Sequence, residues 1–269
     1  MHANLRTFFP CDRRCHRNDP VPQLLRKGKL VEMIKNYRIA ELPVRMDPEY
    51  EPLLSQSVPY LCDDIHTHAY DLLISEESYQ QMEETYPGSP RALIEYMATG
   101  SMFYSRLIAH SGLLIHSSAV VYEDRAYLFS APSGTGKSTH TGLWLKEFPG
   151  AEIINDDKPA LRIFDDGIYV YGTPWSGKTD MSLNKKVKLQ GIAFLERGEK
   201  NEISPMSSIK ALENLLNQTV RPGQRNQASL LMDHLSTLIS RVPIYRFSCN
   251  MDPEAAHVSY ETMSKGIVK

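Results

Sequence analysis

Long apolar runs are absent from this chain. No stretch approaches the roughly 18 continuous apolar residues that a membrane-spanning helix needs. Residues 1–20 are polar and contain arginines, and they lack the apolar centre of a secretory signal. The sequence therefore predicts a protein without a membrane partner.

Cysteine is also scarce. The four cysteines are Cys11, Cys15, Cys62 and Cys249, and their spacing fits neither a disulfide framework nor a zinc ribbon. Cys11 and Cys15, followed by His16, could hold a metal ion, but no second ligand pair lies beside them in the sequence. Unpaired, reduced thiols are the simpler interpretation, and they indicate a cytoplasmic protein.

A strong excess of charge of one sign is lacking too. The net charge is −2, with 42% hydrophobic and 23% charged residues, as in an ordinary globular protein. This balance argues against a broadly basic protein that binds nucleic acid.

A length of 269 residues suits one large domain with a smaller region attached. We place the boundary near Ser111, so that residues 1–110 form an N-terminal α+β region for a substrate or partner, and residues 111–269 a second domain.

Hydrophobic periodicity predicts an α/β protein. Helices are expected at residues 21–36, 75–86, 91–110, 140–148, 208–218, 225–241 and 253–263, and Gly100 could divide the third of them. Strands are expected at residues 37–45, 72–74, 113–121, 126–130, 152–156, 187–195 and 244–249, with a hairpin at residues 159–171. His66 and His68 precede the second strand and could be a metal-ligand pair, although surface residues are the simpler interpretation.

One stretch organises the second domain. The apolar strand at residues 126–129 leads into Ser130-Ala131-Pro132-Ser133-Gly134-Thr135-Gly136-Lys137-Ser138-Thr139, and a helical pattern follows. A strand, a loop of small residues and a Lys-Ser pair at a helix start are the arrangement of a P-loop, whose backbone N–H groups bind phosphate oxygens. Gly134 and Gly136 permit close backbone approach, Lys137 would reach the β- and γ-phosphates, and Ser138 would bind Mg²⁺. The nucleotide-binding residues are expected to be Ser133, Gly134, Thr135, Gly136, Lys137, Ser138 and Thr139, although Ala131 stands where the strict motif has glycine.

A pair of carboxylates follows the next predicted strand. Asp156 and Asp157 come directly after Ile153-Ile154-Asn155. One carboxylate at this place can hold Mg²⁺, and its neighbour can accept the proton of an attacking hydroxyl. His116, in the strand before the P-loop strand, could face the phosphates or be a core histidine.

Three basic residues could contact a substrate. Lys178 lies in a loop-like stretch, residues 171–180, that also holds Trp175 and two glycines. Arg197 follows an apolar strand and Arg221 precedes a Pro-Gly pair, so either could stabilise charge on a transferred phosphoryl group. Each also has an ordinary explanation, because lysines and arginines are common at turns and strand ends.

The order of these motifs resembles HPr kinase/phosphorylase and its relatives, which include lasso-peptide kinases. His116, the loop at residues 131–139 and Asn155-Asp156-Asp157 follow one another as in that family, whose nucleotide domain is shared with ATP-dependent phosphoenolpyruvate carboxykinase. The resemblance covers roughly residues 111–200 and implies a mixed sheet with the P-loop at one end. By position, Asp156 resembles the family's general base, Asp157 its Mg²⁺ ligand and His116 its histidine beside the phosphates. Residues 1–110 do not align with the N-terminal domain of HPr kinases, so the acceptor is not assumed to be HPr.

The sequence thus predicts a kinase that depends on ATP and Mg²⁺. It would transfer the γ-phosphoryl group to a hydroxyl of a protein or peptide, a serine in the resembled family, with Asp156, Lys137 and His116 as catalytic residues. The hexamers of that family favour a homo-oligomer. Two alternatives stay open: a carboxykinase-like phosphotransferase that acts on a metabolite, and a nucleotide-sensing module without catalysis.

Overall fold

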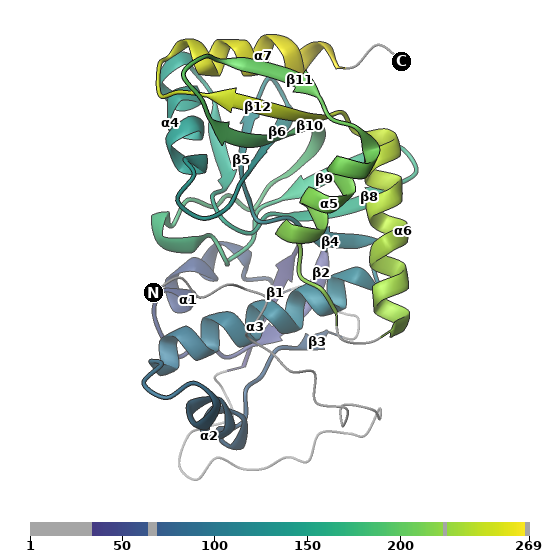
Figure 1. The fold of residues 1–269 in the computed structure, drawn as a ribbon. Helices are drawn as coiled ribbons and strands as arrows, with labels where there is room; N and C mark the ends of the chain where they lie inside the picture. The colour runs from purple at the N-terminus through teal and green to yellow at the C-terminus, as the bar shows by residue number, and fades with distance from the viewer. Residues whose placement is uncertain (1–33, 64–68, 223–224, 267–269) are drawn as a thin grey trace.

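The computed structural model of this chain describes residues 34–63, 69–222 and 225–266 (Figure 1). Cys11, Cys15, His66 and His68 lie outside these residues, as does most of the helix expected at residues 21–36. The last two residues of that expected helix, Lys35 and Asn36, belong to a strand instead.

A sheet of nine strands forms the larger part of the molecule. Its order is β4-β8-β9-β10-β6-β5-β7, and β12 pairs with both β10 and β11. The strands are β4 (Gly112–Leu114), β5 (Ser117–Tyr122), β6 (Arg125–Ser130), β7 (Glu152–Asn155), β8 (Ala160–Phe164), β9 (Gly167–Tyr171), β10 (Lys186–Arg197), β11 (Glu202–Pro205) and β12 (Ile244–Cys249). β10 runs parallel to β6 and β12, whereas β5 is antiparallel to β6 and β7. The sheet is therefore mixed, and the predicted α/β class is confirmed.

Helices cover both faces of the central strands. α4 (Lys137–Glu147) and α7 (Glu254–Lys265) pack on one face, and α5 (Ser208–Gln218) and α6 (Arg225–Arg241) pack on the other. Along β6, Tyr127 and Phe129 join the cluster under α4 and α7, while Ala126 and Leu128 join the cluster under α5 and α6. Successive side chains of a strand point to opposite faces, so this double covering requires the unbroken apolar run seen in the sequence.

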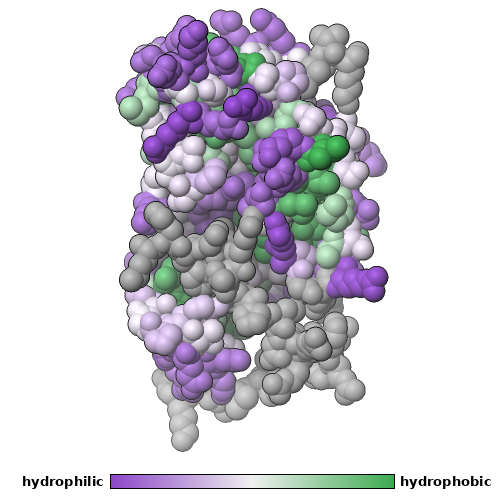
Figure 2. Space-filling view, in the orientation of Figure 1, coloured by the Kyte–Doolittle hydropathy of each residue, from purple (hydrophilic) through white to green (hydrophobic). Residues whose placement is uncertain are grey.

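The apolar faces of α5 and α6 are not fully covered. Figure 2 shows apolar colour gathered on the surface in this part of the molecule, and the exposed apolar side chains of these helices include Ile209, Leu230 and Met232. Their inward residues, such as Leu215 and Leu235, are buried against the sheet.

The N-terminal part forms a smaller layer below the large sheet (Figure 1). Its elements are β1 (Lys35–Ile39), β2 (Leu42–Met46), α1 (Leu53–Gln56), the 3-10 helix η3 (Val58–Tyr60), β3 (Tyr70–Asp71), α2 (Glu76–Thr85) and α3 (Arg91–Ile108). One apolar cluster joins this layer to the sheet, because Phe103 and Leu107 of α3 pack with Leu114, Tyr171 and Trp175. The cluster thus crosses the boundary predicted at residue 111.

Two strand predictions in the N-terminal part are wrong. Residues 37–45 are not one strand but belong to the hairpin of β1 and β2, which turns at Ala40 and Glu41 with φ of 48° and 63°. The usual hairpin residues with positive φ are glycine and asparagine, so the sequence carried no turn signal here. Residues 72–74 are not a strand either, because β3 ends at Asp71.

Other details of the elements also differ from the sequence-based expectations. The strand predicted at residues 113–121 divides into β4, which pairs with β8, and β5, which pairs with β6 and β7. The helix α3 continues through Gly100, where the ring of Trp175 packs so closely that a Cβ would lie 3.1 Å from one of its carbons. The helix after the loop begins at Lys137, as expected for a Lys-Ser pair at a helix start, so it begins before the helical pattern at residues 140–148. The strand β11 was not predicted.

Candidate functional site

The loop at residues 131–136 joins β6 to the N-terminus of α4. Gly134 and Gly136 have φ of 79° and 120°. Residues with a Cβ adopt such backbone angles only with strain. Ala131, at the strict motif's glycine position, is buried and its carbonyl accepts a hydrogen bond of 2.9 Å from Lys137 Nζ. Burial lowers the pKa of Lys137, while the charges of Asp157 and Asp156 raise it. The lysine is therefore folded back under the loop, onto the carbonyl of its first residue.

Strand pairing explains why these groups share one edge of the sheet. β5 is antiparallel to both β6 and β7, with Ser117 opposite Ser130 and Ala119 opposite Asn155. β6 and β7 therefore run in the same direction and end at the same edge. The loop follows β6 there, Asp156 and Asp157 follow β7, and His116 precedes β5. The topology brings together three features that are far apart in the sequence.

Asp156 is a buried carboxylate that accepts hydrogen bonds from two hydroxyl groups. The residue is 7% exposed. Oδ1 accepts from Ser118 Oγ at 2.5 Å, and Oδ2 accepts from Thr179 Oγ1 at 2.8 Å. Ser118 Oγ also lies 2.9 Å from Oγ1 of Thr141, which is one turn of α4 beyond Lys137. Hydroxyl groups thus connect Asp156 to the helix that the loop begins.

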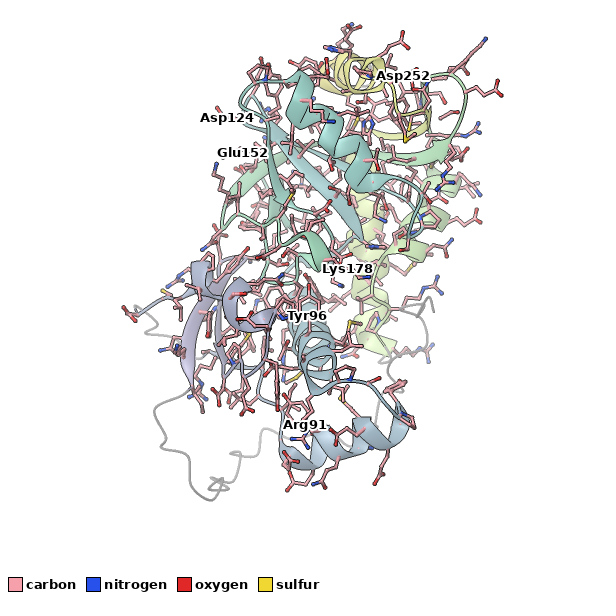
Figure 3. The ribbon with its side chains drawn as sticks, turned by 90° about the vertical axis from the view of Figure 1, so that its left-hand side faces the viewer. Arg91, Tyr96, Asp124, Glu152, Lys178 and Asp252 are labelled. Atoms are coloured by element: carbon pink, nitrogen blue, oxygen red, sulfur yellow. The ribbon has the colours of Figure 1, made fainter. Side chains whose placement is uncertain are left out.

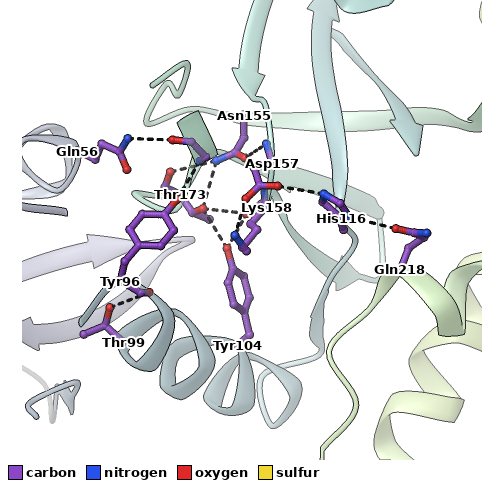
Figure 4. Close-up of polar contacts among 11 residues, drawn as sticks. Gln56, Tyr96, Thr99, Tyr104, His116, Asn155, Asp157, Lys158, Thr173 and Gln218 are labelled. Atoms are coloured by element: carbon purple, nitrogen blue, oxygen red, sulfur yellow. Dashed lines mark hydrogen bonds and ion pairs between the residues drawn. The ribbon is translucent and has the colours of Figure 1, made fainter. Parts of the chain in front are cut away.

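Asp157 is held by two nitrogen groups (Figure 4). Its Oδ1 lies 3.1 Å from His116 Nε2, and its Oδ2 accepts a hydrogen bond from Lys158 Nζ. Although burial raises the pKa of Asp157, the hydrogen bond with His116 and the charge of Lys158 hold it well below its usual range. This carboxyl group therefore stays ionised at neutral pH and suits a hard cation such as Mg²⁺.

His116 lies between Asp157 and the end of α5. Its Nδ1 is 3.2 Å from Gln218 Oε1, and its backbone N–H donates to the carbonyl of Gln218 at 2.7 Å. The break between β4 and β5 is what places the histidine at this edge. His116 is thus fixed on both ring nitrogens and orients Asp157.

A loop from the hairpin strand β9 covers the carboxylates. It contains the 3-10 helix η4 (Gly177–Thr179), whose first N–H donates to the hydroxyl of Tyr96 at 2.9 Å. Lys178 is exposed on this loop and lies between α4 and α3, close to Tyr96 (Figure 3). The predicted substrate residue is thus exposed to solvent on the loop that covers the carboxylates.

The two arginines of the sequence prediction have different surroundings. Arg197, at the end of β10, donates from Nη2 to the carbonyl of Gly134 at 2.7 Å, so it contacts the loop itself. Arg221 donates to the Leu216 carbonyl at 3.0 Å and to Asn217 Oδ1 at 3.2 Å. Its guanidinium is therefore engaged with the end of α5 rather than with the loop.

Several residues of this site were not singled out from the sequence. Ser118 and Thr179 donate hydrogen bonds to Asp156, and Ser118 also contacts Thr141 of α4. Asn155 was expected only as part of the Asn155-Asp156-Asp157 motif, and its Oδ1 accepts from the backbone N–H groups of Asp157 and Lys158 at 3.0 and 2.7 Å. One signal was available for Ser118, because it belongs to a pair of serines inside an apolar strand pattern. The others depend on tertiary contacts.

Asp157 and Ser138 are residues at this edge whose oxygen atoms suit a magnesium ion. Within residues 34–63, 69–222 and 225–266, no group of three or more His, Cys, Asp and Glu residues could hold a metal ion alone. Magnesium needs no such group, since one or two protein ligands, phosphate oxygens and water complete its six positions. Ser138 at the start of α4 and the ionised Asp157 are suitable protein ligands.

The fold and this edge define a mixed α/β protein with a glycine-containing strand–loop–helix turn beside a pair of carboxylates. No protein-family model matches the chain, and no curated protein matches it. Among solved structures it is similar to the HPr(Ser) kinase/phosphatase from Coxiella burnetii, with 14% identity, 57% of this chain and 99% of that chain covered, and a TM-score of 0.30. A likeness at this score does not carry a functional assignment.

No helix in the described part of the chain is long and apolar enough to cross a membrane.

Proposed function

We propose that the protein is a kinase that uses ATP and Mg²⁺ to phosphorylate a hydroxyl group of a protein or peptide. One observation carries this proposal: Ser118 Oγ joins the Asp156 carboxylate to Thr141 of α4, whose hydroxyl donates to the carbonyl of Lys137 at 3.3 Å, so the lysine and the carboxylate meet at one edge of the sheet. A phosphate-binding lysine and two carboxylates at one sheet edge are the groups that phosphoryl transfer requires.

The nucleotide would bind at the loop and the first turn of α4. The first backbone N–H groups of a helix have no partners within the helix, and the helix dipole makes this end positive, so both favour a polyphosphate. Lys137 Nζ would exchange the carbonyl of Ala131 for a phosphate oxygen. Arg197, which already contacts the loop at Gly134, is placed to stabilise added negative charge.

The two carboxylates would have different roles in the reaction. Bound Mg²⁺ neutralises part of the charge on the phosphoryl group, and Ser138 and Asp157 are the residues that would hold it. His116 would keep Asp157 oriented through their 3.1 Å contact. Asp156, whose oxygens already accept hydrogen bonds from hydroxyl groups, would take the proton of the acceptor hydroxyl.

A pair of lysine variants tests the nucleotide site. Lys137→Ala should weaken ATP binding by about 10- to 100-fold, since a charge-assisted hydrogen bond is worth about 1.5–3 kcal/mol. Lys146→Ala is the matched control, because Lys146 is exposed in the last turn of the same helix. Calorimetric titration with ATP and Mg²⁺ measures both. An unchanged affinity in Lys137→Ala would exclude the loop as the nucleotide site.

The acceptor is tested with ATP labelled on its γ-phosphate. A labelled protein or peptide band, formed when the wild-type protein is added to candidate acceptors, is the expected result. Label on a metabolite with no labelled band would favour the metabolite phosphotransferase, and normal ATP binding without any transfer would favour the sensing module.

A further inference from the structure

Thr179 differs from the other hydroxyl partner of Asp156. Ser118 is fully buried within β5, whereas Thr179 is an exposed residue at the end of η4. Its Oγ1 nevertheless donates to Asp156 Oδ2 at 2.8 Å. A hydroxyl at this distance is within the 2.6–3.2 Å range in which a general base can take its proton.

The loop holds Thr179 in this position by contacts on both sides. Gly177 donates its N–H to the Tyr96 hydroxyl, and its carbonyl accepts from Gln56 Nε2 at 3.4 Å. Gly177 has a φ of 77°, and a Cβ on it would lie only 2.9 Å from the Cβ of Asp157. The loop is therefore pressed against the carboxylate pair, and Thr179 is brought to Asp156 by the fold itself.

We propose that Thr179 is a phosphorylation site of this protein, modified by the chain's own phosphoryl-transfer site. The inference rests on the proposed function and adds an acceptor to it. A hydroxyl that is already oriented on the base has the advantage of an intramolecular reaction over an acceptor that must diffuse in.

The reaction balances with ATP as the only co-reactant. Thr179 Oγ1 loses its proton to the Asp156 carboxylate and forms a bond to the γ-phosphorus. The bond between that phosphorus and the oxygen that bridges the β- and γ-phosphates breaks, and ADP leaves. The products are phosphothreonine and ADP, and Asp156 returns its proton to water.

The modification would change access to the site. A phosphate on Thr179 adds a charge of about −1.5 to −2 beside two carboxylates, so repulsion would move the loop away from Asp156. Asp156 Oδ2 would then be free for the hydroxyl of another acceptor. Before modification, any such acceptor must displace Thr179 from the same oxygen.

The experiment uses the full chain with γ-labelled ATP and Mg²⁺ and no added acceptor. We expect label to approach one phosphate per chain, at a rate per chain that does not depend on protein concentration, with mass spectrometry placing it on Thr179. Thr179→Val keeps the shape of the side chain without the hydroxyl and should reduce the label to background. Thr179→Ser should restore it. Ser182→Ala is the matched control on the same loop, because the Ser182 hydroxyl bonds to Tyr60 and Thr173 rather than to Asp156.

Four results would overturn the inference. Label that persists in Thr179→Val, or a rate per chain that rises with protein concentration, would exclude transfer to the chain's own Thr179. An unlabelled wild-type protein that still binds ATP and labels an added acceptor would overturn the inference and leave the proposed function standing. A wild-type protein that binds no ATP would overturn both.

Discussion

Among single residues, His140 has a protonation state that its neighbours determine. It is 3% exposed on α4, and its Nε2 lies 3.2 Å from Nε1 of Trp144. The same Nε2 lies 3.1 Å from Ser259 Oγ, which also accepts a hydrogen bond of 3.0 Å from the indole N–H. Nδ1 has no hydrogen-bond partner in the described structure. Burial lowers the pKa of His140 to about 3, and the folded protein therefore keeps this histidine neutral.

This burial predicts a loss of stability in acid. The folded-state pKa is depressed below the ordinary value of 6.5, so the unfolded chain binds more protons between about pH 6.5 and pH 3. The contribution of His140 to stability is complete above pH 6.5, and it is lost by up to about 1.4 kcal/mol per pH unit as the pH falls.

Urea unfolding between pH 7.5 and pH 5 measures this slope. His140→Gln, which does not titrate, should show a flatter dependence of the free energy of unfolding on pH than the wild-type protein. His257→Gln is the control, because His257 is exposed and its ring nitrogen contacts Glu147 at the surface. Equal slopes for His140→Gln and the wild-type protein would contradict the buried neutral histidine.

Residue identities in the site could be predicted only where local sequence determines them. Lys137 and Ser138 follow from the loop pattern, and Asp156 and Asp157 follow from an apolar strand that ends in acids. Ser118 and Thr179 reach Asp156 from a strand and a loop that are distant in sequence. Their contacts depend on strand pairing, and no local pattern encodes that pairing.

At the scale of elements, the loop that contains η4 packs directly against Asp157 and carries Thr179 to Asp156. Gly177→Ala should strain a backbone with positive φ by about 1–2 kcal/mol and push the loop off Asp157. We expect phosphoryl transfer to Thr179 to fall by about 100-fold, since displacement of reacting groups by about 1 Å can cost that much. ATP affinity should change little, because the loop at residues 131–136 is untouched.

A variant at a second glycine distinguishes the effect of backbone strain from the effect of displacing the loop. Gly150 also has a positive φ, 91°, but a Cβ there would meet nothing within 4 Å. Gly150→Ala should therefore lower stability by a similar amount and leave phosphoryl transfer intact. Thermal unfolding and the transfer assay, run on both variants, make the comparison. Equal transfer rates in the two variants would contradict the role given to the loop.

Helices were easier to predict than strands for a physical reason. Apolar spacing at three and four residues located α2, α3, α5, α6 and α7 within a few residues. The β1–β2 hairpin was missed because its turn uses Ala40 and Glu41, and the break between β4 and β5 was missed because both halves are apolar. A strand boundary of this kind is set by which strand lies alongside, and a single sequence does not contain that information.

At the scale of the whole molecule, the N-terminal layer and the sheet share a core. Phe103 stacks on Trp175 with ring centroids 5.0 Å apart, and the Tyr104 hydroxyl donates to the carbonyl of Lys158 at 2.6 Å. Trp144 lies in the separate cluster under α4 and α7. The two tryptophans of the chain therefore report on different parts of the interior.

This arrangement predicts a single cooperative unfolding transition. In Trp144→Phe, the remaining Trp175 reports by its fluorescence on the cluster shared by α3 and the sheet. In Trp175→Phe, the remaining Trp144 reports on the cluster under α4. In each variant, the urea midpoint from fluorescence should coincide with the midpoint from circular dichroism, since the layers share buried apolar surface. Separate midpoints would mean that the N-terminal layer unfolds independently of the sheet.

The most direct test of the central claim compares ATP binding and phosphoryl transfer in Asp156→Asn. Asparagine keeps the size of the side chain and can still accept from Ser118, but it cannot take a proton from an attacking hydroxyl. The account predicts ATP affinity close to that of the wild-type protein and phosphoryl transfer lowered by about 100- to 10,000-fold, the usual contribution of a general base. Transfer at the wild-type rate in this variant would contradict the account.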